Sequence, residues 1–173
     1  MSRRLRYVPE DGSLVEVTCR TLQSRFLLRP SRELDEIVVG VLGRAQRLYK
    51  VRVCGYMWAS NHFHLLLDID TAHQLSRFMC YVNSNIAREI SRLYGWEDKI
   101  WSRRYQAIVI SGEEEAQIAR LRYLLGNGAP ENIALSEAHA GSGSLPYRKA
   151  AAGGAVCPSR RRSAVPVASV RLS

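Results

Sequence analysis

The chain has 173 residues and a formal net charge of +9, from 25 basic and 16 acidic residues. That length suits one domain with a sizeable core. No apolar run reaches the length of a membrane span, and no secretory signal opens the chain, so we expect a cytoplasmic protein with no membrane partner. The four cysteines are scattered, which favours reduced structural thiols over disulfides or a cysteine zinc site.

The basic excess is concentrated at the C-terminal end. From Leu145 onward there are six basic residues and no acidic residue, which leaves 19 basic against 16 acidic residues before it. Bulk charge is therefore weak evidence that the folded part binds nucleic acid. After residue 135 the composition turns to Ala, Gly, Ser, Pro and Arg without periodicity. We expect a domain over residues 1–135 and a disordered basic tail over 136–173, either functional or a remnant of truncation or frameshift.

Hydrophobic periodicity predicts the first elements in order. A strand over 14–22 is followed by a helix that begins after Ser31, a good N-cap residue with acidic residues just beyond it. A strand over 51–59 then pairs with the next strand through a two-residue turn at 60–61, which is typical of an antiparallel hairpin.

The second half continues the alternation of strands and helices. A long helix starts near Thr71, and Gly95 is a natural stop for it. A strand over 106–110 precedes a last helix that ends near Gly126. The order strand, helix, strand, strand, helix, strand, helix predicts a compact α+β domain. We expect a central antiparallel sheet with helices mainly on one face and a working surface on the other.

Two histidines open the second strand of the hairpin. Side chains alternate along a strand, so His62 and His64 share one face while Phe63 and Leu65 point to the other. Two imidazoles on Cα atoms about 7 Å apart can bind one divalent metal ion. The alternative is a pair of surface imidazoles with ordinary hydrogen bonds, and the pair by itself does not decide.

The last helix offers a nucleophile and a third metal ligand. Tyr123 and Asn127 lie one turn apart, so a phenol and an amide oxygen can address the same point. A phenol can attack a phosphodiester once a metal offsets the phosphate charge, and an amide oxygen suits a hard divalent cation. Tyr81 and Asn85 have the same spacing on the middle helix, so spacing does not choose between the two tyrosines.

Three sequence blocks occur in order: Asn61-His62-Phe63-His64-Leu65-Leu66-Leu67, Trp101-x-x-Arg104-Tyr105, and Arg122-Tyr123-Leu124-Leu125-x-Asn127. Together they resemble the signature blocks of the single-tyrosine transposases of the HUH endonuclease superfamily. The REP-associated tyrosine transposases, which are insertion-sequence transposase-like proteins, are the most similar group. The resemblance covers roughly residues 3 to 130. It implies a ferredoxin-like or RRM-like HUH fold.

The resemblance also implies site residues and a reaction. Tyr123 matches the catalytic nucleophile, and His62, His64 and Asn127 match the ligands of Mg²⁺ or Mn²⁺. The implied activity is that of a metal-dependent single-stranded DNA endonuclease and strand transferase, which acts on hairpin-associated DNA through a 5′-phosphotyrosine. The family often ends this block with Asn-Pro, whereas a left-handed Gly126 here would turn Asn127 away from Tyr123.

Basic and aromatic residues near these blocks are candidates for contacts with single-stranded or hairpin DNA. They are Arg3, Arg4, Arg103, Arg104, Arg120, Arg122 and Trp101. For each arginine the alternative is a solvated surface residue. Monomer and homodimer both stay open, as do cis and trans active sites. The alternative function is a catalytically inactive or domesticated DNA-hairpin-binding protein. An RNA-binding or scaffolding module is disfavoured, because the strands lack the paired aromatic residues of RNA-recognition sheets.

Overall fold

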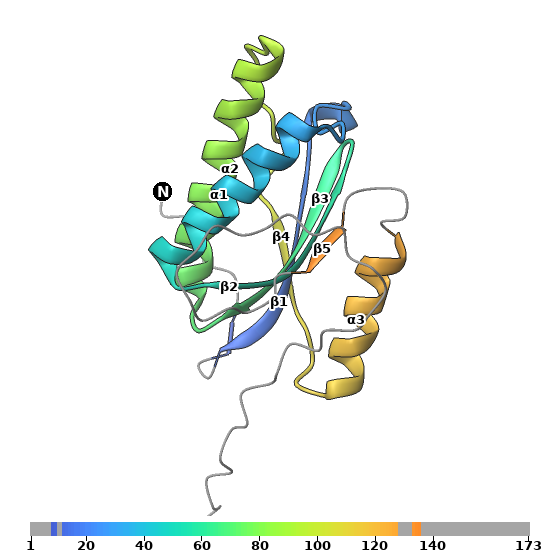
Figure 1. The fold of residues 1–173 in the computed structure, drawn as a ribbon. Coiled ribbons are helices and arrows are strands. Elements are labelled where there is room, and N and C mark those ends of the chain that lie inside the picture. Colours follow the sequence, from blue (N-terminus) through green and yellow to red (C-terminus); the bar gives the residue numbers. More distant parts are fainter. Residues whose placement is uncertain (1–7, 10–11, 128–132, 136–173) are drawn as a thin grey trace, which may run out of the picture.

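The computed structural model describes residues 8–9, 12–127 and 133–135, and in α3 the description of side chains stops at residue 124. The elements, drawn in Figure 1, are β1 (Ser13–Arg20), the 3-10 helix η1 (Leu22–Ser24), α1 (Arg32–Tyr49), β2 (Arg52–Ala59), β3 (His62–Ile69), α2 (Ala72–Tyr94), β4 (Gln106–Val109), α3 (Glu114–Asn127) and β5 (Ile133–Leu135). The tail expected over 136–173 lies outside the described residues.

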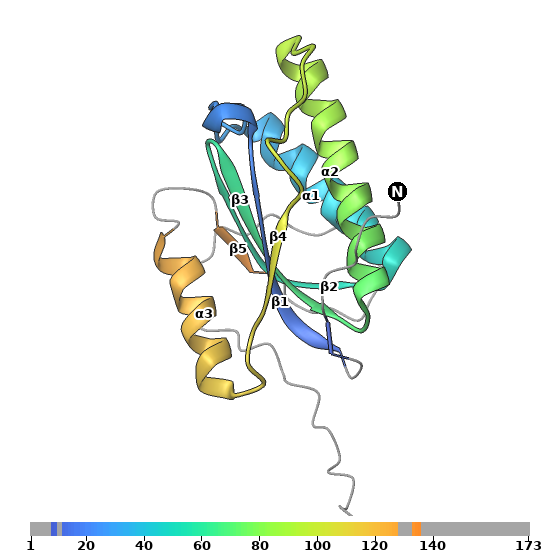
Figure 2. The ribbon, with the colours of Figure 1, turned by 180° about the vertical axis from the view of Figure 1, so that it is seen from behind.

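The strands form one five-stranded antiparallel sheet in the order β4-β1-β3-β2-β5. The element order β1-α1-β2-β3-α2-β4 is that of the ferredoxin-like motif. Figures 1 and 2 show α1 and α2 together on one side of this sheet and α3 on the other. The predicted α+β class, with a central antiparallel sheet and most helices on one face, is confirmed.

Period-two alternation decides which face of each strand is buried. In β1, Val15 and Val17 are fully buried on the side of α1 and α2. In β3, Phe63 and Leu65 join the same core, so the predicted inward face of the histidine strand is confirmed. The intervening residues, His64 among them, face the side on which α3 lies. The sheet therefore has one face committed to the main core and another available for a site.

The bounds of α1 and α2 follow from local capping chemistry. The hydroxyl oxygen of Ser31 accepts a hydrogen bond from the backbone N–H of Leu34 at 3.1 Å, and that of Thr71 accepts one from Gln74 at 3.1 Å. Gly95 ends α2 in a left-handed conformation with φ of 61°, which a glycine adopts without steric cost. These three predicted bounds are confirmed.

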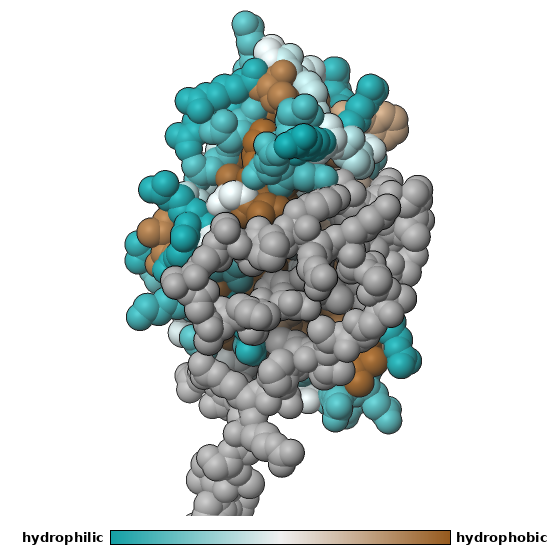
Figure 3. All heavy atoms as spheres, in the orientation of Figure 1, coloured by the Kyte–Doolittle hydropathy of each residue, from teal (hydrophilic) through white to brown (hydrophobic). Residues whose placement is uncertain are grey.

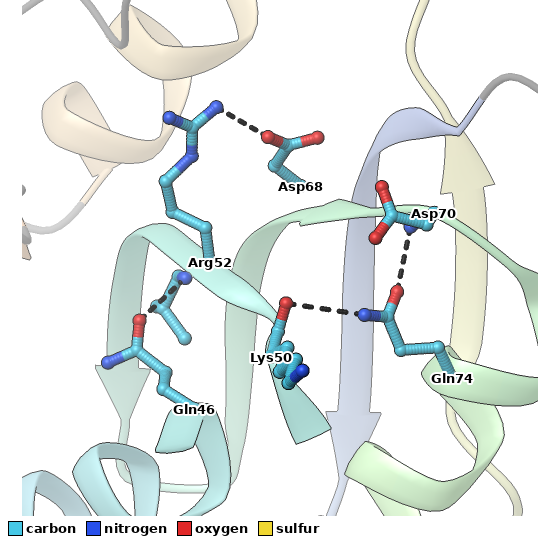
Figure 4. A network of polar contacts seen from close by, with 7 residues as sticks. Gln46, Lys50, Arg52, Asp68, Asp70 and Gln74 are labelled. Carbon is cyan, nitrogen blue, oxygen red and sulfur yellow. Dashed lines mark hydrogen bonds and ion pairs between the residues drawn. The ribbon is translucent and has the colours of Figure 1, made fainter. Parts of the chain in front are cut away.

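Two glutamine side chains join the helices to the ends of strands, as Figure 4 shows. The Gln74 amide nitrogen donates to the Lys50 carbonyl at 3.2 Å, and its amide oxygen accepts from the Asp70 backbone N–H at 2.7 Å. The Gln46 amide oxygen accepts from the Val53 backbone N–H at 2.9 Å. These bonds satisfy backbone groups at points where the regular ladder and helix patterns stop.

One end of the described part of the molecule is largely hydrophilic in the view of Figure 3. Among the coloured residues of Figure 3, hydrophilic side chains cover most of the end where α2 projects, and hydrophobic ones show between them. Within the described residues, no helix combines the length and the apolar character that crossing a lipid bilayer requires.

Candidate active site

The histidine pair lies on the sheet face opposite α1 and α2. The imidazole centroids of His62 and His64 are 5.3 Å apart, and the rings are inclined by 75°. In the β1–β3 ladder, Thr18 lies opposite His64 and Arg20 lies opposite His62. The predicted common face of the two imidazoles is therefore observed.

Each imidazole is held at its Nδ1 atom. His64 Nδ1 donates to Glu16 Oε1 at 2.6 Å, and Thr18 Oγ1 lies 3.2 Å from the same nitrogen. His62 Nδ1 donates to Asn61 Oδ1 at 2.7 Å. A carboxylate only accepts hydrogen bonds, so His64 donates from Nδ1, and the neutral form of its ring has the lone pair on Nε2. Bonds of this kind at Nδ1 are the usual way in which proteins orient a metal-binding histidine.

The carboxylate of Glu16 is 1% exposed and lies between β3 and α3. Burial alone would raise the pKa of Glu16, but hydrogen bonds from His64 and Arg120 outweigh burial and lower that pKa. Both Nε and Nη2 of Arg120 contact Glu16 Oε2. Glu16 is thus an ionised buried group with a partner at each oxygen.

Glu16 is a residue that reasoning from the sequence missed. The sequence pattern that could have indicated it is a glutamate between Val15 and Val17. Alternation places that glutamate on the strand face that points away from the core. The missing information was the strand order, which places β1 directly beside β3. Only with that order does Glu16 come to lie beside His64.

The pKa of His62 is lowered from the ordinary value of 6.5. Burial is the largest cause, followed by the charges of His64 and Arg20. The lowered pKa favours the neutral imidazole, which is the protonation state that binds a metal ion.

Helix α3 carries Tyr123 over the histidine face of the sheet. Leu124 is 2% exposed and forms a small cluster with Cys54 and Leu66, separate from the main core. Tyr123 is 50% exposed, and the guanidinium carbon of Arg120 lies 4.8 Å from the centre of its ring. In the part of the chain that the structure describes, no hydrogen bond joins Tyr123 to either histidine.

The rival tyrosine occupies the other layer of the molecule. Tyr81 lies on α2 and packs against the main core, with its ring 5.8 Å from that of Tyr49. The sheet therefore separates Tyr81 from the face that carries the histidines. Of the two tyrosines with the same helical spacing, Tyr123 is the one on the histidine side.

The third ligand was predicted to be Asn127. Helix α3 runs through Gly126 to Asn127, so the backbone remains helical at the glycine, while the Asn127 side chain lies outside the described residues. Among the described residues, no three His, Cys, Asp or Glu side chains gather as a metal site requires. Two free imidazole Nε2 atoms fit Mg²⁺ or Mn²⁺ if an oxygen donor joins them, so the ligand role of Asn127 stays a prediction.

The arginines predicted to bind DNA differ in their surroundings. Arg103 and Arg122 are exposed, whereas Arg104 is half-buried. Arg120 is paired with Glu16 in the free protein. Contacts of these residues with DNA stay predictions. Two further candidates lie outside the described residues: Arg3 and Arg4.

Trp101 packs on the core beside the histidine strand. Its indole N–H donates to the Asn83 carbonyl oxygen at 2.9 Å, and its ring meets Phe63 edge-on with centroids 5.4 Å apart. Trp101 therefore packs on the core side of the histidine strand, through its contact with Phe63. Its predicted contact with DNA stays a prediction.

No curated protein matches the chain. Among solved structures, the chain is similar to a REP-associated tyrosine transposase bound to a REP hairpin, with a TM-score of 0.52 and 15% identity over 75% of this chain and 74% of that one. A candidate transposase from Deinococcus radiodurans gives a TM-score of 0.48 and 17% identity, over 71% of this chain and 96% of that one.

At such low identity, the likeness to the hairpin-bound structure shows the shared fold. The family is shown by the sequence itself, because the profile of the IS200-like transposases matches residues 21–124, more than half of the chain. The protein is therefore a member of the IS200-like transposase family.

Proposed function

We propose that this transposase is a metal-dependent single-stranded DNA endonuclease and strand transferase, with Tyr123 as its nucleophile. One observation carries the proposal. His62 and His64 share a face, each is held at Nδ1, and the helix with Tyr123 lies over that face. The fold neighbour is bound to a REP hairpin, and we propose hairpin-associated DNA as the substrate class here.

The proposed reaction is a transesterification. The Tyr123 phenol oxygen attacks the scissile phosphorus and forms a 5′-phosphotyrosine bond while the bond to the 3′-oxygen breaks. The attacking phenol loses its proton, and the departing 3′-oxygen gains one to become a hydroxyl, so no net proton is released. A second 3′-hydroxyl can reverse the step, because the phosphotyrosine bond replaces the phosphodiester. Strand joining therefore needs no nucleotide cofactor.

Other residues would hold the metal ion and bind the DNA strand. His62, His64 and Asn127 would hold the Mg²⁺ or Mn²⁺ ion, whose positive charge offsets the charge that develops on the phosphate. Arg103 and Arg122 are exposed and suited to phosphates of the bound strand. The half-exposed Tyr123 is open to a strand that approaches from solvent.

The test captures the covalent product. A library of DNA hairpins with randomised single-stranded flanks, labelled at the 3′ end, is incubated with the protein and resolved under denaturing conditions. We expect a labelled protein–DNA adduct in Mg²⁺ or Mn²⁺, and none in chelator, because the 5′-phosphate fragment carries the 3′ label.

Matched tyrosine variants assign the nucleophile. Tyr123→Phe should abolish the adduct and still bind the hairpins, whereas Tyr81→Phe should keep both properties. An adduct with Tyr123→Phe that is lost in Tyr81→Phe would contradict the assignment. Hairpin binding without an adduct in either metal would favour the alternative of a DNA-hairpin-binding protein.

A further inference from the structure

Glu16 lies where the two halves of the candidate active site meet. We infer that Glu16 is a positioning residue that fixes the ring of His64 and, at the same time, anchors the helix carrying Tyr123 over the histidines of its own chain. The inference deepens the proposed function and rests on it for the roles of His64 and Tyr123.

The contacts of Glu16 point in two directions. From β1, its Oε1 accepts the Nδ1 proton of His64 on β3 at 2.6 Å. Its Oε2 contacts both Nε and Nη2 of Arg120 on α3. One side chain thus joins three elements, and its carboxylate is shielded from solvent because Glu16 is 1% exposed.

The second contact controls the place of Tyr123. Arg120 and Tyr123 are three residues apart on α3, which puts their side chains on neighbouring positions of one helix surface. The Arg120 guanidinium also covers the Tyr123 ring at 4.8 Å. Among the described residues, α3 packs on the sheet through a small apolar cluster around Leu124, and the ion pair adds a polar anchor that holds the helix there.

The first contact excludes Glu16 as the missing metal ligand. Its carboxylate lies at the Nδ1 edge of His64, whereas the metal would bind at Nε2 on the opposite edge of the ring. Within the described residues, Glu16 completes no three-donor cluster with the two histidines. Its geometry is that of a group that orients a ligand rather than one that binds the metal.

A second ion pair on the same sheet face provides a matched control. Arg52 of β2 and Asp68 of β3 face each other in the ladder and form an ion pair, shown in Figure 4. Asp68 is on the same strand as His64, and its ion pair is with Arg52 of β2, not with a histidine or an α3 residue. Asp68→Asn therefore removes a carboxylate charge from this face without touching the proposed linkage.

The test uses the metal-free, DNA-free full chain and two measurements. Imidazole ¹⁵N chemical shifts report the tautomer of His64, and amide hydrogen exchange reports the docking of α3. Glu16→Gln should leave His64 as a mixture of tautomers. It should also speed exchange in α3 by about tenfold or more, since α3 loses the ion pair of Arg120 with the buried Glu16. Asp68→Asn should change neither measurement.

A charge exchange separates the two contacts of Glu16. In the double variant Glu16→Arg with Arg120→Glu, the ion pair can re-form and α3 exchange should return toward the native rate. His64 should not recover its single tautomer, because a guanidinium has no acceptor for the Nδ1 proton. Mn²⁺ affinity should fall in Glu16→Gln and in the double variant alike, and stay unchanged in Asp68→Asn.

The inference is overturned if Glu16→Gln leaves both the His64 tautomer and α3 exchange as they were, or if Asp68→Asn has the same effects. Should Glu16→Gln fail to fold, Arg120→Gln tests the helix contact, and unchanged α3 exchange there would overturn it. The tautomer and hydrogen-exchange measurements need neither metal nor DNA. The nucleophile assignment fails separately, through an adduct that persists in Tyr123→Phe.

Discussion

Trp58 stacks face to face on Phe63, with ring centroids 4.4 Å apart and an angle of 8° between the rings. The two residues are direct partners across the β2–β3 ladder, close to its turn. Trp101 also meets Phe63, by an edge-on contact. Because Phe63 stands between His62 and His64 in the sequence, this aromatic packing fixes the strand segment from which both imidazoles project.

Loosening that packing should weaken metal binding as well as stability. We expect Phe63→Leu to lower the free energy of unfolding by about 1–2 kcal/mol and to lower Mn²⁺ affinity in the folded protein. Phe78→Leu is the matched control, because Phe78 is equally buried in the same core but lies on α2. Urea unfolding and calorimetric Mn²⁺ titration measure the two effects. Equal losses of Mn²⁺ affinity in both variants would show that general destabilisation is the cause.

Removing a proposed ligand should abolish metal binding without unfolding the chain. His62→Ala and His64→Ala should each lower Mn²⁺ affinity by at least about tenfold, while His73→Ala, an exposed histidine on α2, should not. Asn127→Ala should lower the affinity too. Full Mn²⁺ affinity in Asn127→Ala, with losses in the histidine variants, would show that another oxygen donor completes the site.

The stability of the metal-free protein should depend on pH through His62. Its pKa is lowered in the folded chain, so on acidification through the ordinary value of 6.5 the unfolded chain binds a proton before the folded chain does. The free energy of unfolding should therefore fall as pH falls through that range. His62→Gln should flatten this part of the profile, measured by urea unfolding on either side of it. His73→Gln should leave the profile as it is.

The cysteines should differ sharply in reactivity. Burial raises the pKa of Cys19 to about 11, so almost none of it is the reactive thiolate at neutral pH. Cys80 is exposed. Iodoacetamide followed by peptide mass spectrometry should find Cys80 alkylated and Cys19 intact in the native protein, and both alkylated after unfolding in urea. Equal native labelling of the two would contradict the burial of Cys19.

Local chemistry made much of the fold predictable. The hydroxyls of Ser31 and Thr71 cap helices through hydrogen bonds to backbone N–H groups three residues later. Gly95 ends a helix because it adopts a left-handed backbone conformation by itself. Alternation along β3 placed His62 and His64 on one face for the same reason. Each of these features depends on residues within a few positions of one another.

The remaining features depend on contacts between distant segments. Glu16 and Arg120 are 104 residues apart, and no local sequence pattern predicts their ion pair. Tyr81 and Tyr123 had identical spacing to an asparagine, and only the side of the sheet on which each helix packs distinguishes them. The short strand β5 was not predicted, because three residues are too few for period-two alternation to be recognised.

The tight turn at Ser60 and Asn61 restricts how this hairpin can change length. One residue inserted before His62 would exchange the two faces of β3, sending both imidazoles into the apolar layer and Phe63 out of it. Two inserted residues would restore the faces but slide His64 out of line with Thr18, its present partner in the ladder. Substitutions, rather than insertions or deletions, are therefore the route by which this segment can diverge and still keep its imidazoles together.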